Sequence, residues 1–197
     1  MTTTTLKAIQ KELPYDYTEA SLLFHWGKLL KHLGKTKADD EPLEMETILN
    51  INGISDAIWC LRALPDEYES VVRLFNCDMA EHVLHIFENK YPKDKRPRES
   101  IRMSRAYSAG ESTFDELNAA AVAAFNSLDY SRLTAGAAWG AAWASAVAAR
   151  ISSRTSAFDV SDASATSAYR NSSLGDAMRE EEYQTQLFLQ YFGKDKP

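Results

Sequence analysis

Apolar side chains recur at intervals of three and four residues along most of the chain, which is the pattern of helices with one buried face. The first such run extends from Leu22 to Leu33, and Gly34 follows it as a helix stop. No persuasive apolar–polar alternation of a strand is present. The pattern predicts an all-α protein, a compact bundle or array of about seven to nine helices. The further apolar runs fall at residues 45–49, 54–61, 71–87, 101–106, 114–125, 133–151 and 183–192.

Residues that start and end helices separate these runs. Gly53 and Gly110 are expected to end helices, because glycine adopts the left-handed conformation that often follows a helix. Pro97 suits the first turn of a helix, where its missing N–H costs little. Thr113 precedes Glu116 by three residues, which is the spacing of a capping box and predicts a helix start.

The composition changes near Gly110. The first part has a core of leucine, isoleucine and phenylalanine, and the second part is rich in alanine and serine. We expect a mixed-composition helical subdomain at residues 1–110 and an Ala/Trp-rich helical subdomain at residues 111–197. Because no flexible linker separates them, we expect the two to pack as one unit.

Overall composition indicates a folded protein of a reducing cytosol. The 197 residues are 45% hydrophobic and 25% charged, as in ordinary globular proteins, and the net charge of −6 disfavours a general nucleic-acid coat. Two cysteines exclude a disulfide scaffold and fit a reducing compartment. The N-terminal residues lack the basic and apolar regions of a secretory signal. The uncharged stretch Leu133–Ala149 is shorter than the roughly 20 apolar residues of a membrane span, so no membrane association is expected.

Two tryptophans define one face of the alanine-rich run. Trp139 and Trp143 lie four residues apart, beside a ridge of small residues that includes Gly140 and Ala144. Small residues allow a second helix to approach closely while tryptophan fills the neighbouring volume. The two tryptophans are therefore either core residues or part of an interface, since tryptophan is also enriched at binding hot spots.

One basic stretch stands out at residues 90–105. Its side chains could contact phosphates, dock an acidic protein, or pair with carboxylates of the same chain. The candidate binding residues are Lys93, Lys95, Arg96, Arg98 and Arg102.

An acidic cluster precedes the second apolar run. It could favour a positive helix start or meet a basic surface of a partner protein. The candidate partner-binding carboxylates are Asp39, Asp40, Glu41 and Glu44.

Catalytic chemistry is hard to assign. Asp78, His82 and His85 could share a helix face and hold a transition metal, although residues of this kind more often pair or cap within a fold. No nucleophile motif, catalytic carboxylate pair or glycine-rich dinucleotide loop is evident. We therefore expect a protein that is not an enzyme and that has no catalytic residues, metal or cofactor.

Three segments carry a family resemblance. They are residues 33–40, residues 56–63, and residues 73–84 continued through Tyr91-Pro92 to 96–98. Together they resemble uncharacterised phage and prophage proteins with an Ala/Trp-rich helical C-terminal part. The middle segment is also similar to immunity proteins of bacterial toxin systems. Both resemblances imply a small cytosolic helical protein that acts by binding a partner, and neither assigns catalytic residues.

The resemblance leads to a first hypothesis and three alternatives. The first is a non-enzymatic phage-type inhibitor that neutralises a bacterial defence component, specifically an anti-CRISPR protein. The alternatives are a toxin-immunity protein, a nucleic-acid-associated regulator using the basic stretch, and a metal-dependent enzyme centred on Asp78. The expected partner is a protein, either a defence-complex subunit or a toxin, and self-association stays open.

Overall fold

The computed structural model describes residues 2–13, 19–127 and 174–194, together with 143–145, 147–148, 157, 159–161, 163–164 and 167. These residues are helical apart from short connections and one small sheet, which confirms the all-α class. The N-terminal helices are α1 (Leu6–Glu12), α2 (Glu19–His32), α3 (Met45–Asn52) and α4 (Ile54–Trp59). Two 3-10 helices, η1 (Cys60–Ala63) and η2 (Asp66–Tyr68), lead to α5 (Glu69–Lys90), α6 (Arg96–Ser108), α7 (Phe114–Phe125) and α10 (Leu174–Phe192).

Local sequence signals set several of these boundaries as predicted. Gly34 follows α2 with a φ of 66°, and Gly53 separates α3 from α4 with a φ of 94°. Thr113 caps α7: its Oγ1 accepts from the backbone N–H of Glu116 at 3.3 Å. In return, Glu116 Oε2 accepts from the backbone N–H of Thr113 at 2.8 Å, which completes the predicted capping box.

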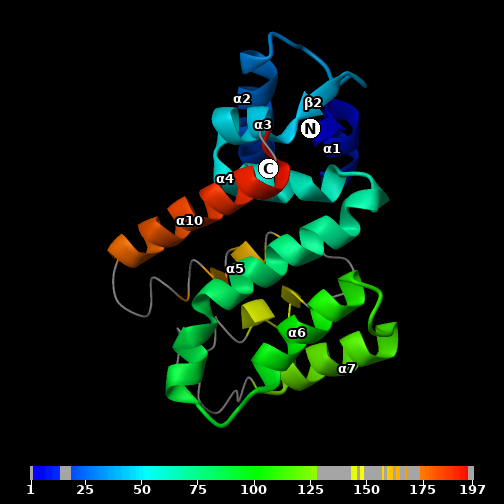
Figure 1. Ribbon diagram of the computed structural model, residues 1–197. Coiled ribbons are helices and arrows are strands. Elements are labelled where there is room, and N and C mark those ends of the chain that lie inside the picture. Colours follow the sequence, from blue (N-terminus) through cyan, green and yellow to red (C-terminus); the bar gives the residue numbers. More distant parts are fainter. Residues whose placement is uncertain are drawn as a thin grey trace.

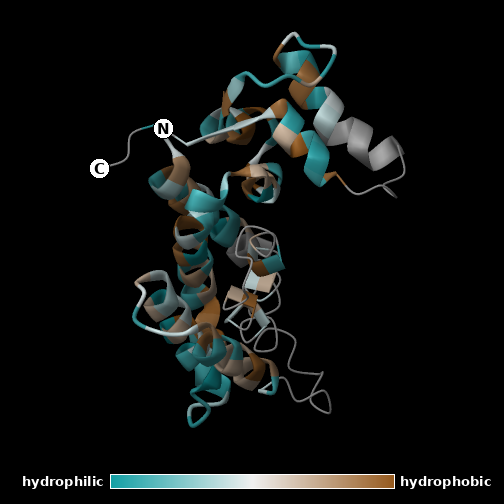
Figure 2. Cartoon of the chain, turned by 90° about the vertical axis from the view of Figure 1, so that its right-hand side faces the viewer, coloured by the Kyte–Doolittle hydropathy of each residue, from teal (hydrophilic) through white to brown (hydrophobic). Residues whose placement is uncertain are grey.

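Helix α5 is the centre of the fold. Its buried side chains include Phe75, Met79, Leu84 and Phe87. In Figure 1, α6 lies on one side of α5 with α7 beyond it, and α10 and the N-terminal helices lie on the other side. Hydrophobic and hydrophilic residues alternate within the coloured helices of Figure 2, as they must when a helix buries one face.

The last helix closes the core. Phe75 of α5 meets Phe188 and Phe192 of α10 edge to face, with ring centroids 6.1 and 5.4 Å apart. Helix α10 also packs against α3 and α4. One continuous apolar core therefore contains residues from both compositional parts of the chain, from Leu6 through Ile101 to Phe192.

A two-stranded antiparallel sheet joins the N-terminus to the loop before α3. Strand β1 (Thr3–Thr5) pairs with β2 (Pro42–Glu44), with Thr3 opposite Glu44. The sequence pattern did not predict these strands, because three residues are too few to display alternation. Thr4 of β1 is buried, and its hydroxyl donates to the carbonyl of Ala63 in η1 at 2.7 Å.

The C-terminal end of α10 returns to this sheet. The ammonium of Lys194 lies 2.7 Å from Glu44 Oε2, and its backbone N–H donates to Glu46 Oε2 at 2.9 Å.

The predicted helix at 133–151 lies partly outside the described residues. Residues 143–145 and 147–148 are helical, and Ala144, Val147 and Ala148 are buried. None of the helices in the described ranges is both long and apolar enough to cross a membrane.

Candidate partner-binding surfaces

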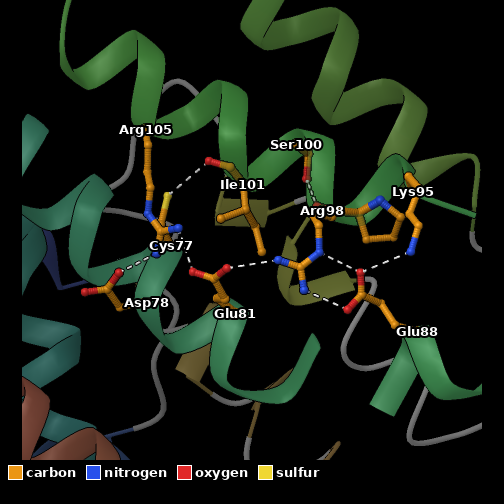
Figure 3. Close-up of polar contacts among 10 residues, drawn as sticks. Cys77, Asp78, Glu81, Glu88, Lys95, Arg98, Ser100, Ile101 and Arg105 are labelled. Carbon is orange, nitrogen blue, oxygen red and sulfur yellow. Dashed lines mark hydrogen bonds and ion pairs between the residues drawn. The ribbon is translucent and has the colours of Figure 1, made fainter. Parts of the chain in front are cut away.

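A ladder of ion pairs connects α5 to α6. Arg98 of α6 forms a bidentate pair with Glu88 of α5, with N–O distances of 2.6 and 2.7 Å, and also reaches Glu81 at 3.2 Å. Two turns further along α6, Arg105 lies 2.6 Å from both Asp78 and Glu81 (Figure 3). Arginines of α6 alternate with carboxylates of α5 along the line of contact, so these ion pairs hold the two helices in register.

The predicted basic binding residues take part in this intramolecular pairing. Arg98 holds the pKa of Glu88 below its ordinary value by hydrogen bonding, and Arg102 acts in the same way on the pKa of Glu99. Lys95 lies 3.8 Å from Glu88. A phosphate or an acidic partner would compete with these carboxylates for the same guanidinium groups.

The two other members of that set lie between α5 and α6 and at the start of α6. Arg96 is held by Asp94, with a shortest N–O distance of 2.6 Å, and lowers the pKa of that carboxyl by hydrogen bonding. Lys93 is exposed in the connecting loop and has no side-chain partner among the described residues. Most of the positive charge predicted at this stretch is therefore neutralised within the chain.

The predicted acidic residues are also paired. Lys35 lies 2.7 Å from both Asp39 and Glu41, and its hydrogen bond lowers the pKa of Asp39. Asp40 pairs with Lys7 of α1. Glu44 lies on β2 and forms an ion pair with Lys194, so this carboxylate links the small sheet to the segment that follows α10.

The residues considered as metal ligands have other partners. Asp78 accepts from Arg105 and from the hydroxyl of Tyr191, each at 2.6 Å. His82 Nδ1 lies 2.6 Å from Glu180, whereas His85 Nδ1 lies 3.0 Å from the carbonyl oxygen of His82. Among the described residues, no three histidine, cysteine or carboxylate side chains are grouped so that they could hold a metal.

The contacts of His82 belong to a polar cluster between α5 and α10. Its ring stacks on Tyr183, with centroids 3.7 Å apart, and burial raises the pKa of that tyrosine to about 12. Glu180 is buried and accepts from Gln184 at 3.0 Å, and the hydroxyl of Ser161 donates to Gln184 at 2.5 Å. Sequence reasoning missed this cluster, because its members are separated along the chain and only their place in the fold unites them.

The alanine-rich segment packs closely against α6. The hydroxyl of Ser100 donates to the carbonyl of Ser145 at 2.9 Å, and that of Ser104 donates to the carbonyl of Ala148 at 3.0 Å. Trp143 is partly buried against the core and its ring lies 5.5 Å from that of Phe125. Trp139, the other predicted aromatic site, lies outside the described residues.

Both cysteines are buried in the core. Burial raises the pKa of Cys77 to about 11 and raises the pKa of Cys60 still further. A buried thiol that stays protonated at neutral pH is a poor nucleophile.

A further surface, on α7, escaped the sequence reasoning. Phe114, Val122 and Phe125 are large apolar side chains that remain exposed on this helix. The signal was the run Leu117–Phe125, which has no charged residue although α7 lies at the edge of the fold. An exposed apolar face of this kind marks a candidate interaction surface.

The described residues thus define a helical protein in which His82, His85 and most of the predicted binding charges have partners within the chain, and both cysteines are buried. The chain belongs to the family described as Imm-5 like putative immunity protein, whose profile matches residues 63–183. The match crosses the compositional change at Gly110 and covers α5, α6 and α7 completely. No curated protein and no solved structure matches the chain.

Proposed function

We propose that this protein confers immunity to a bacterial protein toxin by binding that toxin in the cytosol, and that it acts without catalysis of its own. The observation that carries the proposal is the match of an immunity-protein family to residues 63–183. This supports the immunity alternative over the anti-CRISPR role expected first, which gains no support from the family match.

The arrangement of polar groups is consistent with action by binding. Asp78, His82 and His85 are each committed to a neighbouring residue, and the cysteines are buried. The nucleic-acid alternative is weakened in the same way, because Arg96, Arg98 and Arg102 already hold carboxylates.

Co-expression with a toxin tests the proposal. The toxin domain encoded by the gene beside that of this protein is placed under an inducible promoter in a bacterial host, with and without this chain. We expect growth to be restored by this chain and not by an immunity protein of another family. The purified pair should also form a stable complex by size-exclusion chromatography. Continued killing, together with no complex between the purified proteins, would refute an immunity role towards that toxin.

A further inference from the structure

Helix α7 presents an apolar surface to solvent. Phe114, Val122 and Phe125 are 42%, 51% and 38% exposed. Between Leu117 and Phe125, Asn118 is the one residue with a polar side chain. A helix at the edge of a globular protein ordinarily carries charged residues on its outer side, so this surface differs from the usual pattern.

The exposed apolar residues share one face. Positions 114, 118, 122 and 125 are separated by four, four and three residues, which places them within an arc of roughly 80° at 100° per residue. The inner side of the helix carries the buried residues Leu117 and Ala124 and packs against α6. We call the four residues Phe114, Asn118, Val122 and Phe125 the α7 outer face. This face lies beside the buried side of the helix, and at its C-terminal end the ring of Phe125 also contacts that of Trp143, with centroids 5.5 Å apart.

Negative charge flanks the α7 outer face. Glu111 and Asp115 are exposed near its N-terminal end, and neither has an ion-pair partner among the described residues. The chain has no lysine or arginine between Arg105 and Arg132, and Arg105 is bound to α5. An apolar centre with an acidic rim is complementary to an apolar side chain flanked by lysine or arginine.

The rim also distinguishes between occupants. In a two-fold symmetric dimer the same patch faces itself, and this part of the chain offers no lysine or arginine to pair with Glu111 and Asp115. A nucleic acid would bring phosphates to the same carboxylates. A different protein with a basic surface meets neither objection.

We propose that the α7 outer face is the docking site for the toxin, and that the toxin presents an apolar side chain with basic neighbours to it. This inference rests on the immunity function proposed above. It adds the surface that is used and the chemistry of the partner surface.

Charge substitution on α7 tests the docking site. The probe is the purified toxin domain of the co-expression test, titrated calorimetrically with the full-length chain. Val122→Lys should raise the Kd about tenfold or more, as expected for a residue at the centre of an interface. The matched control is Met178→Lys, which places the same charge at an apolar position of α10 that is 64% exposed, and should leave the Kd unchanged.

A second variant tests the rim. Glu111→Lys combined with Asp115→Lys should slow association and reduce its dependence on salt, because steering by complementary charge is removed. Circular dichroism and melting curves of the free proteins show whether each variant is folded.

The outcomes separate this inference from the proposed function. A wild-type chain that neither protects nor binds refutes the immunity role. If the wild-type chain binds and Val122→Lys binds with the same Kd, the docking site is refuted alone. Two other results would also overturn it. One is dimerisation of the wild-type chain that Val122→Lys abolishes, which would show that a second copy covers the face. The other is a fall in the melting temperature of free Val122→Lys well beyond that of Met178→Lys, which would show that the chain's own residues cover it.

Discussion

At the scale of single residues, Glu88 near the end of α5 forms a bidentate ion pair with Arg98 of α6. Its two oxygens accept from two nitrogens of Arg98, a geometry that is stronger than a single contact. We predict that Glu88→Gln lowers the free energy of unfolding by about 0.5–1 kcal/mol at pH 7, the upper range for a partly exposed pair. Urea denaturation measures this loss.

The same pair predicts a pH dependence. Arg98 lowers the pKa of folded Glu88, so the contribution is complete above the unfolded-state pKa of about 4.3. It is lost as the pH falls through the lower pKa of the folded state. The difference between wild type and Glu88→Gln should therefore be constant from pH 7 to 5 and shrink towards pH 3. Glu99→Gln is the control. Glu99 and its partner Arg102 both lie on the exposed surface of α6, so the loss of unfolding free energy should be smaller than for Glu88→Gln. A difference that persisted undiminished at pH 3 would contradict the assignment.

The cysteines provide a second prediction at this scale. Cys60 and Cys77 are buried, and burial raises the pKa of both thiols. We expect neither to react with a thiol-specific chromogenic reagent at pH 8 within the time in which a free cysteine reacts completely, and both to react in denaturant. Rapid reaction of the native protein would show that the core opens readily around them.

At the scale of elements, two glycines of α2 and its end should respond oppositely to one substitution. Gly27 lies inside the helix and Gly34 follows it with a φ of 66°, and an added Cβ would meet no atom within 4 Å at either position. Gly27→Ala should stabilise the protein by about 0.5–1 kcal/mol, because alanine loses less backbone entropy. Gly34→Ala should destabilise it by about 1–2 kcal/mol, because an L-residue is strained there. Thermal unfolding of both variants tests the sign, and a shift in the same direction for both would contradict the assigned conformations.

The helix boundaries were the part of the fold most accessible from the sequence, because their causes are local. The Thr113–Glu116 capping box lies within one turn, and so does the stop at Gly34. The sequence also identified Arg98 as an exposed cation, but could not assign Glu88 and Glu81 as its partners. That pairing depends on how the turn after Tyr91 folds α6 back along α5, which no spacing along the chain reveals.

At the scale of the whole molecule, α10 contributes the aromatic residues that complete the core. Phe188 is fully buried against Phe75, and the next residue, Leu189, is 37% exposed on the same helix. Phe188→Ala should lower the free energy of unfolding by about 3–5 kcal/mol, whereas Leu189→Ala should lower it by less than about 1 kcal/mol. Denaturant midpoints of the two variants provide the comparison, and equal losses would show that α10 does not pack as described.

Contacts between distant segments could not be predicted from the sequence pattern. His82 and Glu180 are 98 positions apart, and the periodicity of each helix shows that it has a buried face without showing against which helix. The short strands were missed for a related reason, since Thr3 finds its partner Glu44 only after two helices have intervened. The α7 outer face could have been noticed from its lack of charge, but whether such a run is covered or exposed depends on its neighbours.

The packing of α10 and Lys194 against the first half of the chain has a consequence for synthesis on the ribosome. Glu44 lies opposite Thr3 in the sheet and forms an ion pair with Lys194, which follows α10. Phe75 of α5 packs against aromatic rings that α10 supplies. A nascent chain from which α10 has not yet emerged exposes Phe75 and the surfaces of α3 and α4 that α10 later covers. Native packing of the first half is therefore completed only after α10 has left the ribosome, and until then these apolar surfaces are available to chaperones.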